Sequence, residues 1–350
     1  MQNPIDFKVG NASATSMVPT LPMLPMMPMM PMLTQLFCPA RLICLVWVIF
    51  MLAGTNHTQA QTLPKADHDS DVYATALLEK HASLEKQLGK TSFGRPLVIE
   101  SFEDTGNVNG HAYAVLDAPF TTVSATFRGA TNWCEVMLLH LNTKYCHATT
   151  ATSTSTTGAP TLLKVSVGKK TPQEIEDAFA LEFTLRPVAA TPRYLAVRLN
   201  ADKGPLGTSD YRIELEAVPL PHGKTFMHLR YAYGYGVAGR LAMQGYLATV
   251  GSGKVGFSYV NGDPKQGYVG GVRGTVERNT VRYYLAIEAF LASLGRPAAQ
   301  QLEARLGHWF DATEQFAQQL HEIDRDSYLS MKRDEHRRQQ GHARPGAPAS

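Results

Sequence analysis

Two arginines interrupt the most apolar helical segment of this 350-residue chain, at 276–294. Arg278 and Arg282 stand four residues apart, so a helix places their side chains on one face. Glu288 lies further along the same segment, among aliphatic and aromatic residues. Guanidinium groups in apolar surroundings suit an anionic head group, such as that of a lipid or a fatty acid. We therefore expect Arg278, Arg282 and Glu288 to form the polar part of a ligand-binding cavity.

Tyrosines supply the expected wall of this cavity. Tyr231 and Tyr233 fall on one side of a predicted strand, because side chains alternate along a strand. Tyr283 and Tyr284 lie on the apolar helical segment. Each tyrosine offers an apolar ring and a polar hydroxyl group. These four side chains therefore suit an amphipathic ligand.

The same arginines also allow a structural interpretation. Charged side chains are seldom buried without partners. In that case the two guanidinium groups form ion pairs with sheet carboxylates such as Glu182, Glu214 or Glu216, or lie at an exposed edge of the helix. The sequence leaves both interpretations open.

Common catalytic and cofactor motifs are absent from the sequence. There is no Gly-x-Ser-x-Gly and no His-Glu-x-x-His. The nearest approach to a phosphate-binding loop is Gly253-Lys254, but Ala248 and Val255 stand where that motif needs Gly and Ser or Thr. We therefore expect no cofactor and no metal. The net charge of +3, without a long basic block, also gives no reason to expect nucleic acid as a partner.

An export signal precedes the globular part of the chain. Arg41 is followed by an apolar run at 42–53 and then by Thr58-Gln59-Ala60, which is typical of a secretory signal cleaved after Ala60. The run is shorter than the ~20 apolar residues that span a bilayer, although an uncleaved N-terminal anchor is the alternative. We therefore expect a periplasmic or secreted protein that meets the membrane only through this signal.

Four cysteines occur in the chain, and two of them would leave with the signal. Cys134 and Cys146 remain as an even pair in an exported domain, which favours a disulfide. The alternatives are two free thiols, or a metal site with His140 and His147. The spacing of these residues matches no familiar zinc motif.

The chain divides into segments of different composition. Methionine and proline recur before the signal, a pattern that looks like a mis-assigned start. No internal repeat or second core is evident. The predicted segments are a low-complexity stretch at 1–31, the signal at 32–60, an N-terminal helical region at 61–96, one main domain at 97–294, C-terminal amphipathic helices at 295–340 and a disordered tail at 341–350.

Hydrophobic periodicity predicts the elements of the main domain. A period of two marks strands that have one buried face and one exposed face, and a helical period marks the segments around them. Short gaps with Pro and Gly separate the strands. The predicted strands are 97–102, 111–116, 162–167, 179–185, 195–199, 211–217, 227–233, 254–260 and 268–272. The predicted helices are 70–88, 119–128, 133–141, part of 236–249, 276–294 and a last one reaching about 338.

This order of elements resembles the START-like, or Bet v 1-like, superfamily. The resemblance is carried by the hairpin at 97–116, by Pro119-Phe120 at the start of a helix, by the meander at 162–235 and by the buried helix at 276–294. It implies an α+β helix-grip fold, in which a curved antiparallel sheet grips a long C-terminal helix, here with extra N- and C-terminal helices. Members mostly hold a hydrophobic ligand between the sheet and the helix, which implies a cavity there.

Three functions are compatible with these features. The first is an exported binding protein for a hydrophobic small molecule or lipid. The second is an enzyme of the same fold, such as a cyclase or hydrolase, with Glu288 and either His140 or Tyr284 as the acid–base pair. The third is an envelope protein whose helices at 70–88 and 300–338 bind a partner. The sequence does not predict the oligomeric state.

Overall fold

A computed structural model describes residues 65–91, 93–149, 161–249, 251 and 253–342. The chain divides into two units, 1–60 and 61–350, and all described residues belong to the second unit. The predicted low-complexity stretch and signal lie outside the described residues, as does most of the predicted tail. No helix in the described part is long and apolar enough to cross a membrane.

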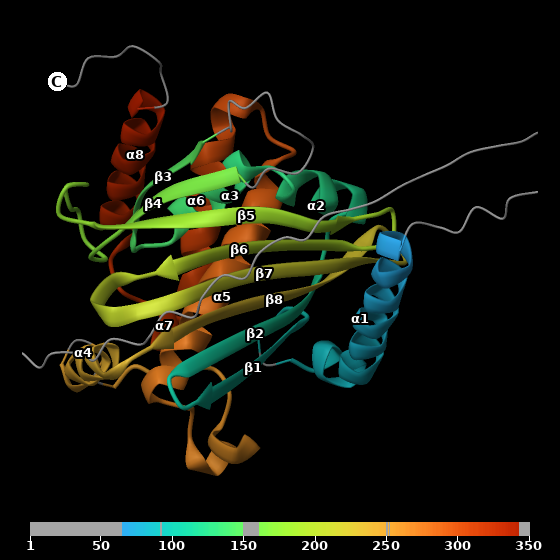
Figure 1. The fold of residues 1–350 in the computed structure, drawn as a ribbon, viewed down its shortest axis with the longest axis horizontal. Coiled ribbons are helices and arrows are strands. Elements are labelled where there is room, and N and C mark those ends of the chain that lie inside the picture. The colour runs from blue at the N-terminus through green and yellow to red at the C-terminus, as the bar shows by residue number, and fades with distance from the viewer. Residues whose placement is uncertain (1–64, 92, 150–160, 250, 252, 343–350) are drawn as a thin grey trace, which may run out of the picture. The chain divides into compact units, whose positions relative to one another are not determined.

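Eight strands form one antiparallel sheet (Figure 1). The strands are β1 (Leu97–Asp104), β2 (Asn107–Leu116), β3 (Thr143–Thr149), β4 (Thr161–Val167), β5 (Phe179–Ala190), β6 (Leu195–Lys203), β7 (Thr208–Leu220) and β8 (Lys224–Tyr235). Their order in the sheet is β1-β2-β8-β7-β6-β5-β4-β3, so the first hairpin pairs with the last strand. The alternation of apolar and polar residues gives each central strand one face toward the core.

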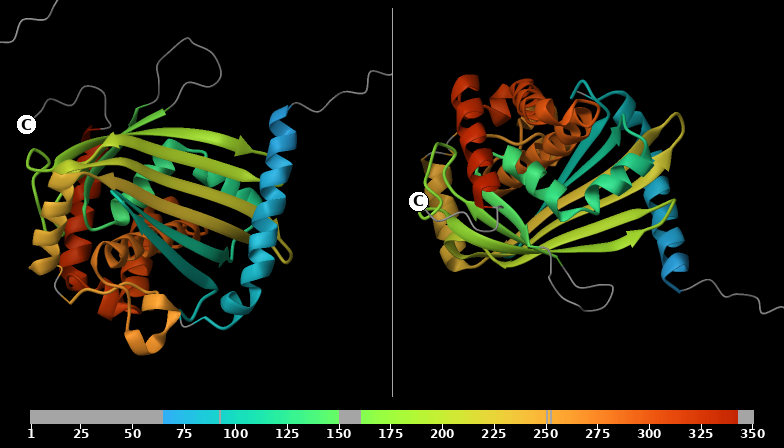
Figure 2. Two further views of the ribbon diagram at one scale, coloured as in Figure 1. Left: turned by 60° about the horizontal axis from the view of Figure 1, so that its bottom comes forward. Right: turned by 90° about the horizontal axis from the view of Figure 1, so that it is seen from above.

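The long helix α5 (Gly271–Ser293) lies on one face of this curved sheet (Figures 1 and 2). Its residues Val281, Leu285 and Ile287 are fully buried. Two shorter helices, α2 (Phe120–Phe127) and α3 (Ala130–Leu139), pack on the same side of the sheet. The predicted α+β helix-grip fold is therefore confirmed.

Helix α1 (Lys65–Gly89) covers part of the opposite, outer face of the sheet. Leu77, Leu84 and Leu88 of α1 pack with Phe226 in a second hydrophobic cluster. The helical period of 70–88 predicts Tyr73 on the same buried stripe as these leucines, but Tyr73 is 58% exposed. The reason is that Tyr73 lies at the margin of the contact, where it stacks on Tyr194.

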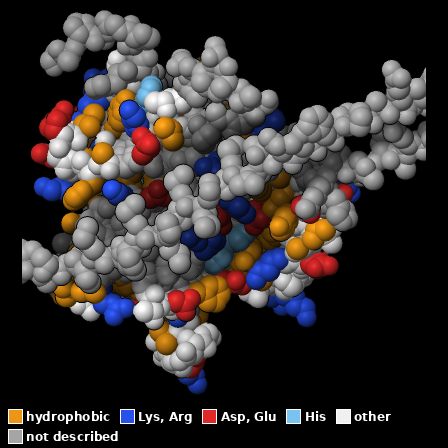
Figure 3. Space-filling view, viewed as in Figure 1, with side chains coloured by type: hydrophobic (Ala, Val, Ile, Leu, Met, Phe, Trp, Pro, Cys, Tyr) orange, Lys and Arg blue, Asp and Glu red, His pale blue; other side chains and the backbone are white. Residues whose placement is uncertain are grey.

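Polar side chains gather on the part of the outer face that Figure 3 shows. Nδ1 of His111 lies 2.9 Å from Nε2 of His228, and Nδ1 of His228 lies 3.0 Å from Glu216. Tyr194 donates a further hydrogen bond to Glu216. The result is a chain of hydrogen bonds that links β2, β8 and β7 to the residue just before β6.

The strands of the structure differ from the prediction in two ways. The sequence does not predict β3, and no strands form at 254–260 and 268–272. That region holds two 3-10 turns, η2 (Val260–Gly262) and η3 (Pro264–Gln266), and only a single bridge joins Tyr259 to Tyr268. Within 268–272, Gly271 has a positive φ angle, and within 254–260 the N–H groups of Phe257 and Ser258 donate to the Glu277 carboxylate instead of to a strand partner.

The last predicted helix is broken into three. These are α6 (Ala298–Glu314), α7 (Ala317–Leu320) and α8 (Arg325–His342). Phe316 has non-helical backbone angles, and the Asp324 side chain accepts a hydrogen bond from the Ser327 N–H at the start of α8. The breaks let α6 and α8 fold back on the domain, where Trp309 stacks on Tyr328 with ring centroids 5.0 Å apart.

The predicted disulfide between Cys134 and Cys146 is present. It joins α3 to β3, and both cysteines are buried in the main core. The crosslink therefore fixes the segment that connects the helices on the inner face of the sheet to one edge of the sheet.

Candidate ligand-binding cavity

A cavity of about 300 Å³ lies between the sheet and α5. Its apolar wall includes Val165, Leu181 and Phe183 from the sheet and Met137 from α3. Met243 contributes from α4 (Val237–Ala248), the helix that follows the last strand. This position matches the cavity that the sequence resemblance implies.

Cationic and amide side chains line another part of the cavity. Lys170, Arg278 and Arg282 provide the charges, and Asn142 and Asn279 are the amides. Among the described residues that line the cavity, none is an aspartate or a glutamate. The lining therefore favours a ligand with an apolar body and an anionic or strongly polar end.

The structure brings five of the predicted site residues to this cavity. Helical periodicity explains the two arginines, which are four residues apart, and Tyr283, which is four residues from the cavity-lining Asn279. On β8, Tyr231 and Tyr233 both face α5, as their alternation predicts. The residues are Arg278, Arg282, Tyr283, Tyr231 and Tyr233.

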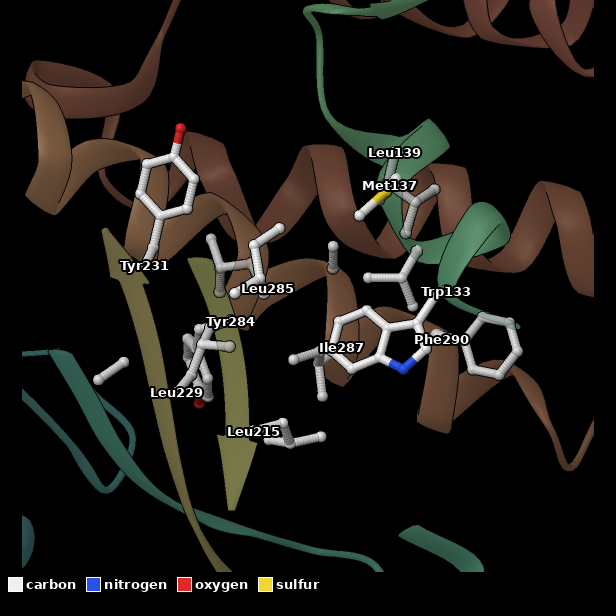
Figure 4. Close-up of a cluster of buried hydrophobic side chains, with 14 of the residues drawn as sticks. Trp133, Met137, Leu139, Leu215, Leu229, Tyr231, Tyr284, Leu285, Ile287 and Phe290 are labelled. Atoms are coloured by element: carbon white, nitrogen blue, oxygen red, sulfur yellow. The ribbon is translucent and has the colours of Figure 1, made fainter. Parts of the chain in front are cut away.

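Tyr284 and Glu288 do not line the cavity. The Tyr284 hydroxyl donates to Glu288 Oε1 at 2.8 Å, and Arg95 forms an ion pair with the same carboxylate. One residue along a helix turns the side chain by about 100°, so Tyr284 faces away from Tyr283. Figure 4 shows Tyr284 beside Leu229, while the hydroxyl of Tyr231 points away from the cluster of buried side chains.

Two acid–base pairs are predicted for Glu288. The structure forms the pair with Tyr284, outside the residues that line the cavity, and does not form the pair with His140. His140 lines the cavity and lies against Tyr283, with ring centroids 5.2 Å apart. Glu288 is engaged with Arg95 on another face of α5. The expected pairing of Glu288 with His140 is therefore not formed.

The two arginines have different partners. Arg282 Nη2 lies 2.8 Å from Oε1 of Glu322, a residue between α7 and α8, and it also donates to the Leu320 carbonyl. Arg278 donates to the Val255 carbonyl and to Thr275 Oγ1, each at 3.2 Å. Each interpretation of the arginines is therefore correct in part. Both residues line a cavity, and Arg282 forms an ion pair with Glu322.

The predicted sheet partners of these arginines lie elsewhere. Glu214 pairs with Arg230, and Glu216 pairs with His228. These glutamates belong to the polar rows of the outer face, because they alternate with the core-facing residues of β7.

Histidine 140 contributes a neutral ring to the cavity wall. Burial, followed by the nearby charges of Arg282 and Lys332, lowers the pKa of His140 well below its usual value. Its Nδ1 accepts a hydrogen bond from the Asn142 N–H at 3.2 Å, which places the ring proton on Nε2. His140 therefore presents a donor, and not a base, to its side-chain partner Asn279.

Burial raises the pKa of Tyr231, Tyr233 and Tyr283, so their hydroxyl groups stay protonated. Tyr231 and Tyr283 pack with ring centroids 5.3 Å apart, and Tyr211 stacks on Tyr233 at the same separation. The wall is therefore a layer of neutral aromatic rings that carry hydrogen-bonding groups.

Two of the cavity's polar residues, Lys170 and Asn279, were missed in the sequence. Asn279 stands three residues before Arg282 on α5, so helical spacing could have identified it. Lys170 follows β4 in an irregular segment, where no periodic signal exists.

Comparisons with known proteins add little beyond these observations. No protein-family model matches the chain, and no curated protein matches it in sequence. Human StAR-related lipid transfer protein 5 is similar in structure, with 9% identity over 52% of this chain and 90% of that one (TM-score 0.28). Norcoclaurine synthase from Thalictrum flavum has 14% identity over 45% of this chain and 80% of that one (TM-score 0.29). A conserved protein from Geobacillus kaustophilus has 10% identity over 53% of this chain and 95% of that one (TM-score 0.31).

The strand order and the position of α5 themselves establish the class of fold. An eight-stranded antiparallel sheet curves around one long C-terminal helix. The chain therefore has a START-like, helix-grip fold, as the order of its predicted elements indicates.

Proposed function

We propose that this chain is an exported binding protein for a hydrophobic or lipid-like ligand. The observation that carries the proposal is the cavity between the sheet and α5, with apolar side chains on one part of its wall and Arg278 and Arg282 on another. Ligand pockets in proteins typically have this composition and a volume of roughly 300–1,000 Å³. The ligand's apolar body contacts residues such as Val165 and Phe183, and its polar end meets the arginines.

Export rests on the N-terminal sequence and on the cysteines. The segment 32–60 has the order of a cleaved signal. The Cys134–Cys146 bond suits an oxidising compartment such as the periplasm or the extracellular space. A mature protein that begins at Gln61 is the expected product.

Filling the cavity tests the proposal. Ala242 of α4 lines the cavity, so Ala242→Trp adds a large side chain to the space that the ligand would occupy. Val237 lies on the same helix and is 80% exposed, so Val237→Trp is the matched control. We expect Ala242→Trp to weaken binding of a fluorescent fatty-acid analogue at least tenfold and Val237→Trp to leave it unchanged. Equal binding by both variants would place the ligand outside this cavity.

A further inference from the structure

Three cations from three separate parts of the chain surround the carboxylate of Glu322. Oε1 lies 2.6 Å from Lys170 Nζ and 2.8 Å from Arg282 Nη2, and Oε2 lies 3.2 Å from Lys254 Nζ. The Glu322 side chain is 8% exposed and that of Arg282 is 2% exposed. This is the densest convergence of cations on one carboxylate in the described part of the chain.

The cavity and the Glu322 carboxylate share two of these cations. Lys170 and Arg282 line the cavity, whereas Glu322 does not. Each of these two residues therefore contacts the Glu322 carboxylate and also borders the ligand space. A lysine ammonium has three donors and an arginine guanidinium has five, so neither group is limited to one acceptor.

Charge balance gives this arrangement a consequence. A buried cation is strongly destabilising without an opposite charge, so Glu322 supports Lys170 and Arg282 when the cavity is empty. The same negative charge repels any anion that enters the cavity toward these two residues. Glu322 therefore limits the affinity of the site for the ligands that its cations attract.

We propose that the ligand is an amphiphile with a carboxylate head group and that Glu322 is the internal counter-ion that sets its affinity. The inference rests on the proposed function, because it needs a ligand in this cavity. The head group binds at Lys170 and Arg282, with Arg278 one helical turn away. Glu322 acts through these cations and is a positioning residue with an electrostatic effect.

A matched set of ligands separates this inference from the proposed function. Dodecanoic acid, dodecanol and dodecylamine share one apolar chain and differ in the charge of the head group. At pH 7.5, calorimetric titration of the mature protein should give the tightest binding for the acid and the weakest for the amine. If none of the three binds, the proposed function itself fails. If the alcohol or the amine binds as tightly as the acid, the proposed binding function is supported and the inference of a carboxylate head group is wrong.

Substitution of Glu322 tests the counter-ion. Glu322→Gln keeps the shape and removes the charge, so we expect dodecanoic acid to bind about tenfold more tightly, a typical size for coupling between two sites. Binding of dodecanol should not change. Glu303 pairs with Arg333 on the exposed surface, so Glu303→Gln is the control. An unchanged or weaker affinity for the acid in Glu322→Gln would overturn the role.

A second variant keeps the test independent of folding. Lys170 is more exposed than Arg282, at 22%, and its loss removes one of the three cations around Glu322. Lys170→Gln should weaken the binding of dodecanoic acid about tenfold and leave the binding of dodecanol unchanged. Equal loss of both ligands would indicate a change of shape and would contradict the electrostatic account.

Discussion

At the scale of single residues, Arg282 illustrates how a buried charge is tolerated in this core. Its guanidinium group meets the Glu322 carboxylate and the Leu320 carbonyl, and its backbone carbonyl accepts a hydrogen bond from Trp309 Nε1. Lys170 and Lys254 also contact Glu322, so the carboxylate keeps cationic partners when Arg282 is lost. Removal of Arg282 should therefore be less harmful than breaking an isolated buried pair.

This reasoning gives the first prediction. Arg282→Gln should lower the free energy of unfolding by about 2 kcal/mol, below the 3–5 kcal/mol typical of a broken isolated pair. Arg333→Gln, which removes an exposed ion pair with Glu303, should lower the free energy of unfolding by much less than Arg282→Gln does. Urea denaturation at pH 7 measures both variants. Similar losses of unfolding free energy in the two variants would show that burial of Arg282 does not increase its contribution to stability.

A second prediction at this scale concerns His111 on the outer face. Burial and the nearby charges of His228, Arg230 and Lys80 lower the pKa of His111 to about 4. The unfolded chain, with the ordinary pKa near 6.5, then binds more protons than the folded chain between pH 4 and 6.5. The free energy of unfolding therefore rises with pH across this window, and the stabilisation is lost on acidification.

His111→Asn should reduce the slope of the free energy of unfolding against pH in this window. His140, whose pKa is also lowered, should retain part of the slope. Urea unfolding at several pH values between 4.5 and 7 measures the effect, with His308→Asn on the exposed side of α6 as the control. A slope unchanged by His111→Asn but reduced by His308→Asn would contradict the assignment.

At the scale of elements, the disulfide has a measurable role. Cys134 and Cys146 are 12 residues apart and connect α3 to β3. Closing a loop of this length stabilises a protein by about 3 kcal/mol, mainly by restricting the unfolded chain. The double variant Cys134→Ala/Cys146→Ala should lose about that much in urea denaturation under oxidising conditions. A reducing agent should destabilise the natural protein but not the variant, and equal sensitivity of the two would argue against the crosslink.

Long periodic elements could be predicted from the sequence, whereas short irregular ones could not. Helix α5 and the strands β5 to β8 carry enough alternating or helical positions to define both their type and their buried face. Strand β3 has few residues, and its sequence Thr-Lys-Tyr-Cys-His-Ala-Thr lacks a clean apolar alternation. It forms because β4 supplies its hydrogen-bonding partner and the disulfide fixes its position.

The candidate site shows the same division. Helical spacing predicts Arg278 and Arg282 on one side of α5, and both residues line the cavity. The sequence could not indicate whether Tyr283 or Tyr284 faces the cavity, because buried residues occur on nearly all sides of α5. Glu322 lies about 40 residues beyond Arg282, and only the fold brings the two together.

At the scale of the whole molecule, the C-terminal helices are part of the main domain. The apolar side chains Leu306, Trp309 and Tyr328 belong to the main core. On α8, Lys332 and Glu335 are fully buried and pair with each other at 2.7 Å. Lys144 of β3 binds the other oxygen of Glu335 at 3.1 Å. These buried faces are therefore occupied within the chain, which argues against a role for them in binding a partner.

The buried cluster of Lys144, Lys332 and Glu335 leads to the fourth prediction. Glu335→Gln leaves two buried lysines without their shared carboxylate, and it should destabilise the protein by about 3–5 kcal/mol. Burial already lowers the pKa of Lys332 to about 8, so part of the cost is relieved by loss of its proton. Glu174→Gln, at an exposed glutamate near Arg338, is the control for thermal unfolding. A melting temperature for Glu335→Gln equal to that of the control would show that α8 is held by other contacts.

Native mass spectrometry of the protein purified from an exporting host tests the central claim most directly. Spectra are recorded before and after extraction with organic solvent. We expect a chain that begins at Gln61, two hydrogens lighter than its reduced form, and a bound lipid-sized mass that extraction removes. A protein without any bound mass, which also fails to take up dodecanoic acid or dodecanol when these are added, would contradict the proposal that the cavity binds a hydrophobic ligand.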